Sequence, residues 1–185
     1  MFFSLDGIDG VGKTTQMQLF CQWLTEQGAQ VVTCRDPGST PLGERVREIL
    51  LHSGAETPIS ARTEMLLYMA ARAQLVDELI APALAAGKTV VSDRYLLANV
   101  VYQGHAGGLD VAAVRAVGQV ATNGLQPDCT FVLDMAPTAA RSRVGMSATH
   151  SSGRPASLNT RPPSCSPASA SITSYPRCPK ARVAS

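Results

Sequence analysis

Short, mostly apolar runs alternate with helically spaced apolar positions along the first 140 residues of the chain. Residues 2–6, 31–34, 89–92 and 129–133 have the length and composition of buried β-strands. Between them, apolar residues recur every three or four positions, which is the period of an amphipathic helix. This alternation predicts an α/β fold of three layers, a doubly wound parallel sheet between helices, with ligands at the carboxyl ends of its strands.

The helical stretches have recognisable ends. Gly28 and Gly87 end two of them, and Asp110 precedes a third as a predicted N-cap. Pro82 predicts a kink in the longest helix, because proline has no amide hydrogen for the helical ladder. The predicted helices cover about residues 13–27, 42–50, 61–86 and 111–120.

This periodicity ends near residue 145. Residues 1–140 carry fourteen acidic and nine basic side chains, a formal charge of −5, whereas residues 141–185 carry seven basic and no acidic ones, a charge of +7. The second segment consists largely of Ser, Pro, Ala and Arg and shows no strand or helix period. We therefore expect one domain over residues 1–144 and a disordered tail over residues 145–185.

Length and composition narrow the class of protein. A chain of 185 residues suits one compact domain. A secretory signal has basic residues before its apolar run, and the apolar N-terminal run of this chain has none. No apolar run in the sequence could span a bilayer. The five cysteines are scattered without CxxC spacing. We expect a cytoplasmic protein with no membrane partner.

The segment from Gly7 to Thr14 matches the phosphate-binding pattern GxxxxGK[ST], and it lies between a predicted strand and a predicted helix. Its glycines let backbone amides face phosphate oxygens, and the helix N-terminus favours negative charge. A chance glycine turn is the alternative, but the pattern is long and correctly placed. The residues predicted to bind ATP are Gly7, Ile8, Asp9, Gly10, Val11, Gly12, Lys13, Thr14 and Thr15.

Acidic residues near this loop are candidates for metal or substrate contacts. Asp9 would repel bound phosphates, so we expect it to contact a metal, a sugar hydroxyl or a cationic neighbour. The alternative is a solvated acid of the loop without a functional role. Asp93 and Arg94 end the third strand, where an ion pair capping the strand is the alternative to a functional role. We predict that Thr14 and Asp93 bind Mg²⁺ beside a phosphate-binding Arg94.

Five motifs in order make residues 1–140 resemble thymidylate kinase, a family of P-loop nucleoside monophosphate kinases. They are Asp9 inside the phosphate loop, residues 35–44 (RDPGSTPLGE), Ala70-Ala71-Arg72, Asp93-Arg94-Tyr95 and residues 99–104 (NVVYQG). The resemblance implies transfer of a phosphoryl group from ATP to dTMP with Mg²⁺, in a homodimer. It does not extend past about residue 145.

The resemblance also implies a role for each dTMP-binding residue. Tyr68 would stack on thymine, Arg72 would hydrogen-bond the base edge, and Arg47 and Arg94 would hold the acceptor phosphate. Taken singly, Tyr68 is as well explained by core packing and Arg47 by a solvated helix surface. The implied set is Asp9, Asp36, Arg47, Tyr68, Arg72, Arg94, Asn99, Tyr102 and Gln103.

Departures from the family pattern concern the turn after the second strand and the source of a catalytic arginine. Ser39 and Asp36 replace the more usual glycine and glutamate. Gly10 stands where some members carry an arginine that stabilises the transition state, an interaction worth about 10³ to 10⁵ in rate. Members with glycine supply it from a lid after the fourth strand, which here implies Arg143. The catalytic set is therefore Asp9, Lys13, Arg94 and Arg143.

The family's last strand and helices are not recognisable in the tail. We hypothesise that the tail is a non-native reading frame, from a frameshift or sequence error between residues 143 and 150. The alternatives to an active dTMP kinase are an impaired nucleotide-binding remnant and a kinase for another nucleoside monophosphate. A GTPase is disfavoured because no NKxD motif follows the loop. A nucleic-acid-binding module is also disfavoured, because the basic residues of the tail are spaced apart and the other 140 residues are acidic overall, so we expect no nucleic-acid partner.

Overall fold

A computed structural model describes residues 1–52 and 58–148. Its core is a parallel sheet in the order β2-β3-β1-β4. Each strand lies where the hydrophobic runs predict one: β1 (Phe2–Gly7), β2 (Val31–Arg35), β3 (Thr89–Asp93) and β4 (Cys129–Leu133). This strand order places the carboxyl ends of β1 and β3 next to each other. The phosphate loop begins at the end of β1, and Arg94 follows β3 directly.

Helices connect the strands and cover the sheet. The four predicted helices are confirmed, whereas the helix after the fourth strand (Pro137–Ala148) and the helical segment from Leu96 to Ala106 were not predicted. Part of that segment is π-helical, so its apolar residues do not follow the 3.6-residue period. The α-helices are α1 (Lys13–Glu26), α2 (Pro41–His52), α3 (Ala61–Leu75), α4 (Ala81–Ala85), α5 (Leu96–Asn99), α6 (Val111–Ala121) and α7 (Pro137–Ala148), with π-helical turns η1 (Val76–Ile80) and η2 (Val100–Ala106).

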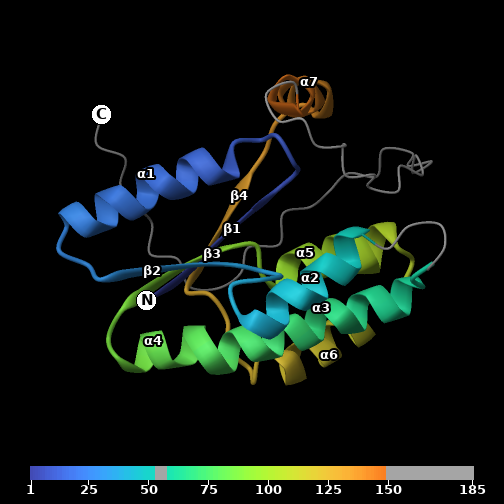
Figure 1. Cartoon of the computed structure of the whole chain (residues 1–185), viewed down its shortest axis with the longest axis horizontal. Helices are drawn as coiled ribbons and strands as arrows, with labels where there is room; N and C mark the ends of the chain where they lie inside the picture. The colour runs from blue at the N-terminus through green and yellow to red at the C-terminus, as the bar shows by residue number, and fades with distance from the viewer. Residues whose placement is uncertain (53–57, 149–185) are drawn as a thin grey trace.

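The sheet lies between two helical layers, as Figure 1 shows with α1 on one side of the strands and α3 and α4 on the other. Alternation along β1 produces this arrangement, because successive side chains point to opposite faces. Phe3 and Leu5 pack with residues of α1, whereas Phe2 packs with residues of α3, η1 and α4. The predicted three-layer α/β/α fold is confirmed.

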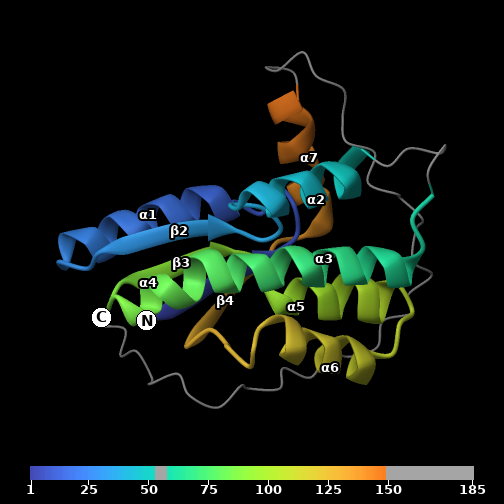
Figure 2. The same cartoon turned by 60° about the horizontal axis from the view of Figure 1, so that its bottom comes forward.

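A helical cluster extends the second layer beyond the sheet. Met65 and Met69 of α3 pack with Val100 of η2 and Val114 of α6, and all four are buried. Figure 2 shows α3 between α2 and α6. This second core fixes α3, the helix that carries Tyr68 and Arg72, with respect to the sheet.

Two positions test the signals for helix ends and kinks that the sequence contains, Asp110 and Pro82. The Ala112 amide donates to Asp110 Oδ1 at 3.0 Å, which confirms the predicted N-cap of α6. In the longest helix the irregularity lies at η1, where the Ala81 amide donates to the Val76 carbonyl. Pro82 follows within the first turn of α4, so the π-helical turn takes the place of the predicted kink.

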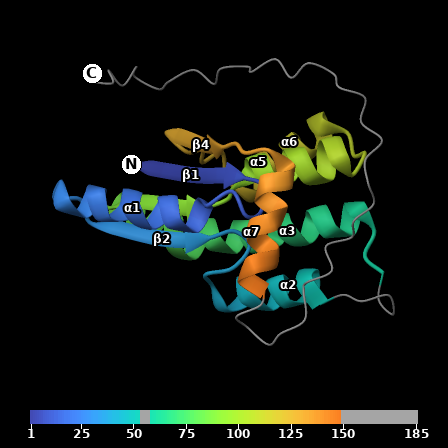
Figure 3. The ribbon, with the colours of Figure 1, turned by 90° about the horizontal axis from the view of Figure 1, so that it is seen from above.

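Helix α7 follows the carboxyl end of β4 and lies crosswise to the strands in Figure 3. It extends to Ala148, so regular structure continues beyond the expected start of the tail at residue 145. The predictions of a disordered tail and of a non-native frame concern mainly residues 149–185, which lie outside the described residues. Over the described ranges, no helix has the length and apolar character needed to cross a membrane.

Candidate active site

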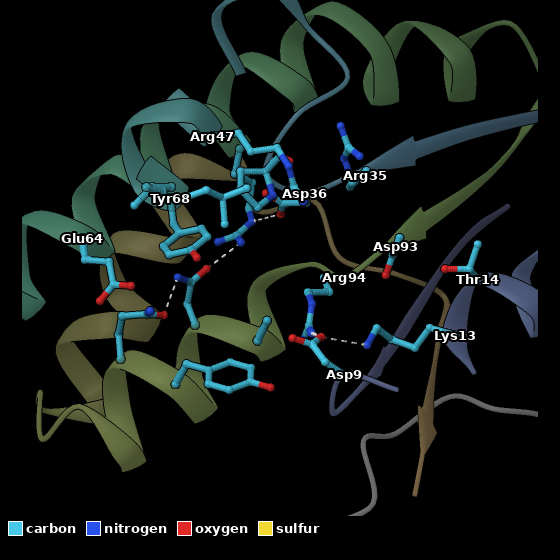
Figure 4. Close-up of a pocket in the computed structure, with 18 of the residues that line it drawn as sticks. Asp9, Lys13, Thr14, Arg35, Asp36, Arg47, Glu64, Tyr68, Asp93 and Arg94 are labelled. Carbon is cyan, nitrogen blue, oxygen red and sulfur yellow. Dashed lines mark hydrogen bonds and ion pairs between the residues drawn. The ribbon is translucent and has the colours of Figure 1, made fainter. Parts of the chain in front are cut away.

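One cavity of about 700 Å³ opens at the carboxyl ends of β1, β2 and β3 and brings together most of the predicted site residues. It separates the phosphate loop from the helices α3, α5 and η2 (Figure 4). The predicted residues that line it are Asp9, Gly10, Gly12, Lys13, Thr14, Thr15, Asp36, Arg47, Tyr68, Arg72, Asp93, Arg94, Asn99, Tyr102 and Gln103.

The phosphate loop depends on glycine at its first position. A Cβ at Gly7, where φ is 145°, would lie 2.5 Å from the carbonyl oxygen of Leu133. Gly12 begins α1 with φ of 101° and provides no side-chain cap, so the first amides of α1 are available for an anion. Lys13 Nζ donates to the carbonyl oxygens of Gly7 and Ile8 at 2.9 and 3.0 Å, which holds the ammonium group over the loop.

Asp9 joins the two cations at this end of the cavity. Its Oδ1 accepts from Arg94 Nη2 at 2.6 Å and lies 3.5 Å from Lys13 Nζ (Figure 4). The Asp9 side chain is 55% exposed, whereas those of Lys13 and Arg94 are 9% and 20% exposed, so water and ligands reach these contacts from the Asp9 side. Arg94 therefore pairs with Asp9 of the loop, and not with Asp93 as in the strand-capping alternative.

Arg94 has an unusual backbone conformation. Its φ is 68°, a left-handed value that costs a residue with a side chain about 1 to 3 kcal/mol. Two contacts hold it: the Arg94 amide donates to the Leu5 carbonyl at 2.9 Å, and Ser92 Oγ donates to the Arg94 carbonyl at 2.6 Å. The guanidinium also lies over the Tyr102 ring, 5.5 Å from its centre. The turn thus directs this cation towards the phosphate loop.

A buried polar network forms the opposite end of the cavity. Arg72, which is 1% exposed, donates from Nε to Asp36 Oδ2 and from Nη2 to Asn99 Oδ1, both at 2.5 Å. Asn99 Nδ2 in turn donates to Gln103 Oε1 at 2.7 Å. Burial raises the pKa of Asp36, and the neighbouring Arg72 opposes that shift. The network fixes the orientation of both amide side chains before any ligand binds.

Arg47 and Tyr68 lie on the same side of the cavity as this network, away from Lys13 and Thr14 (Figure 4). Arg47 Nη1 donates to the carbonyl oxygen of Pro37 at 3.1 Å, so its stem is held against the turn after β2. Tyr68 is half-buried with its ring at the cavity wall. Both side chains therefore have access to a ligand.

The turn after β2 is held by its own polar contacts. Ser39 has φ of 64°, a conformation that glycine adopts more easily. Its hydroxyl accepts from the Arg35 amide at 2.9 Å, and its amide donates to Glu44 Oε1 at 2.7 Å. Arg35 Nη2 also donates to both carboxylate oxygens of Glu44 at 3.1 Å. These contacts allow serine in place of the family's glycine.

Thr14 and Asp93 offer oxygen ligands next to the loop. Both line the cavity, and Asp93 Oδ1 is buried without a hydrogen-bond partner in the described part of the chain. Carboxylate and hydroxyl oxygens suit Mg²⁺, which usually combines one or two protein ligands with substrate phosphates. Over the same residues no group of three or more His, Cys, Asp or Glu side chains is placed to hold a metal. The pair therefore fits a metal that nucleotide phosphates also bind.

Arg143 is not among the residues that line this cavity. It lies on α7 and lines a separate hollow with Phe131, Asp134 and Met135. The main cavity is also lined by residues that were not among the predicted site residues: Arg35 and Pro37 of the motif over residues 35–44, and Leu50, Leu51, Glu64 and Ala98. Glu64 could have been found, because it precedes Tyr68 by four residues and so shares its helix face.

Comparison with known proteins supports the resemblance. The model of the family described as thymidylate kinase matches residues 5–157. A thymidylate kinase of Thermoanaerobacter sp. (strain X514) is 46% identical over 144 residues, which are 78% of this chain and 70% of the relative. One of Synechococcus sp. (strain JA-3-3Ab) is 47% identical over 147 residues, 78% of this chain and 71% of the relative.

A solved structure agrees with these relatives. The crystal structure of thymidylate kinase from Ehrlichia chaffeensis superposes with a TM-score of 0.69 at 31% identity, covering 81% of this chain and 87% of that one. The match in sequence therefore extends to the arrangement of helices and strands. On both grounds the chain belongs to the thymidylate kinase family.

Proposed function

We propose that the chain transfers the γ-phosphoryl group of ATP to the phosphate of dTMP, forming ADP and dTDP. The observation that carries this proposal is that a phosphate loop and a polar, aromatic pocket face each other in one cavity with Arg94 between them (Figure 4). Such a cavity holds two nucleotides end to end, which aligns their phosphates for direct transfer. The family assignment supports the same reaction.

ATP would bind with its phosphates over the loop. The amides at the N-terminus of α1 and the Lys13 ammonium would hold the β- and γ-phosphates. The Lys13 ammonium already lies over the loop through its bonds to Gly7 and Ile8, so little reorganisation is needed. Thr14 and Asp93 would hold Mg²⁺, which neutralises charge on the phosphates when bound.

The acceptor would lie at the opposite end. Tyr68 offers a flat apolar surface for a pyrimidine, and Arg47 and Arg94 supply two cations for the monophosphate. Gln103 accepts from Asn99 through its carbonyl oxygen, so its amide NH₂ group is oriented for an acceptor on the base. Arg72 would act mainly by fixing this network, since most of its donors are already bonded to protein.

Asp9 would have two roles in sequence. Without substrate it pairs with Arg94 and Lys13, and an incoming phosphate would replace it on Arg94. The released carboxylate would then be free to accept a hydrogen bond from the deoxyribose hydroxyl of dTMP. Exchange of one anion for another keeps the cations neutralised throughout.

The position of Arg143 outside the main cavity favours a second hypothesis, in which the chain binds both nucleotides but transfers phosphate slowly. Loss of one arginine that stabilises the transition state lowers the rate of transfer by a factor of about 10³ to 10⁵. The two hypotheses predict the same nucleotide affinities and different turnover rates.

A coupled assay of ADP release tests the proposal. We expect turnover with dTMP at least tenfold above that with dUMP, CMP or AMP. Binding of dTMP without ADP release would support the impaired reading, and a preference for another monophosphate would reassign the substrate. We also expect a cytoplasmic location, from the scattered cysteines, and a homodimer, as the resemblance implies; light scattering of the purified chain tests the dimer.

A further inference from the structure

Arg94 contacts an anion and an aromatic ring at the phosphate end of the cavity. Its Nη2 donates to Asp9 Oδ1 at 2.6 Å (Figure 4). Its guanidinium carbon lies over the Tyr102 ring, 5.5 Å from the centre of that ring. In the proposed reaction the acceptor phosphate replaces Asp9 on Arg94. The contact with the ring is then the one that a bound ligand leaves in place.

Tyr102 belongs to η2, and its neighbours in that segment are anchored. Val100 is buried in the cluster formed by α3, η2 and α6. Gln103 is buried as well: its side chain accepts from Asn99 at 2.7 Å, and its carbonyl oxygen accepts from the Leu109 amide at 3.1 Å. Tyr102 itself is 42% exposed and lines the cavity. Packing of η2 therefore fixes the backbone that carries the ring, while the ring contributes little to the core.

A ring and a carboxylate attract a guanidinium group in different ways. A carboxylate occupies the N–H donors of arginine, which are the groups that bind a phosphate. A ring attracts the cation through its quadrupole and leaves those donors to the ligand. This attraction grows as the cation loses contact with water, and the Arg94 side chain is only 20% exposed. The ring can therefore hold Arg94 without competing with the phosphate.

We propose that Tyr102 is a positioning residue whose ring holds the Arg94 guanidinium at the phosphate end of the cavity while the acceptor phosphate takes the place of Asp9. Asp9 holds the cation in the free protein, and Tyr102 holds it in both states. Arginine has several rotatable bonds, and ordering them on binding costs free energy that a ring already in contact reduces. This inference rests on the proposed binding of dTMP.

Two other roles of Tyr102 make different predictions. A ring that contacted the sugar or the base would also contribute to the binding of thymidine, which lacks the phosphate. A hydroxyl group that carried the effect would make Tyr102→Phe as weak as a variant without the ring. Positioning of Arg94 predicts instead that the ring matters for a ligand with a phosphate, and only while Arg94 is present.

The test is calorimetric titration of dTMP and of thymidine into the wild type, Tyr102→Leu, Tyr102→Phe, Arg94→Gln, and Tyr102→Leu combined with Arg94→Gln. We expect Tyr102→Leu to weaken dTMP by about fivefold, in the range of a lost cation–π contact, and thymidine by less than about twofold. Tyr102→Phe keeps the ring and should bind dTMP within about twofold of the wild type. In Arg94→Gln, which has lost the cation, Tyr102→Leu should weaken dTMP no further.

Val101→Ala is the matched control for disturbance of η2. Val101 is the neighbouring exposed residue of the same segment, and it is not among the residues that line the cavity. The control should change the affinity of neither ligand. Because Tyr102 is exposed, its variants should melt near the temperature of the wild type.

Three results would overturn the inference: equal loss of dTMP and thymidine affinity in Tyr102→Leu, the same loss of dTMP affinity with and without Arg94, or a phenylalanine variant as weak as the leucine variant. The experiment does not require turnover, so a wild type that binds dTMP but releases no ADP would refute the kinase proposal and still test Tyr102. A wild type that binds no dTMP would overturn both.

Discussion

The two ends of the cavity are built differently. At the nucleoside end, Asp36, Arg72, Asn99 and Gln103 are buried and bonded to one another. At the phosphate end, Asp9 is exposed and contacts Arg94 and Lys13 through a single oxygen. One end is set by folding, whereas the other consists of charges that a ligand can re-pair.

This difference separates stability from activity. A buried ion pair leaves an uncompensated charge when one partner is removed, so changes at the nucleoside end should destabilise the fold. Asp9 is exposed, and pairs of an exposed charge contribute about 0 to 1 kcal/mol, so removal of Asp9 at the phosphate end should leave stability almost unchanged. Function at that end comes from where the charges lie when phosphates replace water.

The largest effect on stability is expected for Arg72→Met. The variant leaves Asp36 buried without its cation and should lose about 3 to 5 kcal/mol of unfolding free energy. Arg35→Gln is the matched control, because it breaks the exposed pair with Glu44 and should lose about 1 kcal/mol or less. Urea denaturation measures both. Similar losses in the two variants would mean that the buried and exposed pairs are energetically equivalent.

A second prediction concerns pH and compares wild type with Asp6→Asn. Because burial in β1 raises the folded-state pKa of Asp6 to about 6 from 3.8, the folded protein binds more protons than the unfolded chain between these values. Wild-type stability should therefore fall, relative to the variant, as pH rises from about 4 to about 6 and stay constant above. The full difference is on the order of 3 kcal/mol. Parallel stability curves from pH 4 to pH 7 would contradict the raised pKa.

At the nucleoside end, Tyr68→Ala should weaken dTMP by about 1 to 2 kcal/mol, roughly 5- to 30-fold, through loss of stacking surface. Tyr68→Phe keeps the ring and should bind within about twofold of the wild type. Calorimetry measures both affinities, and the affinity for ATP serves as the internal reference. If the phenylalanine variant were as weak as the alanine variant, the hydroxyl would be the contact instead of the ring.

The smallest effect is expected at the turn after β2. Ser39→Ala keeps the strained φ and loses the acceptor for the Arg35 amide, so it should lose about 0.5 to 1 kcal/mol of unfolding free energy. Ser39→Gly loses the same acceptor but relieves the left-handed backbone, so it should be close to neutral. Thermal melting compares the two. A glycine variant less stable than the alanine variant would contradict this account.

Local patterns predicted the fold and the phosphate end well. The strand, glycine loop and helix around Lys13 are contiguous in sequence, so period and motif suffice to identify them. Tyr68 and Arg72 were recognisable as neighbours because four residues on a helix share a face. The placement of both at the cavity follows from packing of α3, which the sequence alone did not show.

The buried network could not be read from local patterns. Arg72 meets Asp36 and Asn99 across 36 and 27 residues, and only the parallel sheet brings them together. The burial of Asp6 was missed for the same reason, because a strand-ending acid and a solvated one look alike in sequence. The π-helical η2 was missed because its hydrogen bonding departs from the helical period.

The most direct test of the account is transfer of label from γ-³²P-ATP to dTMP by the wild-type chain and by Lys13→Ala. We predict labelled dTDP in amounts equal to ADP in the wild type. In the variant the rate should fall by about 10² or more, with dTMP affinity unchanged. Absence of labelled dTDP in the wild type, or an equal rate in the variant, would contradict the central claim that this cavity joins a triphosphate to a pyrimidine monophosphate.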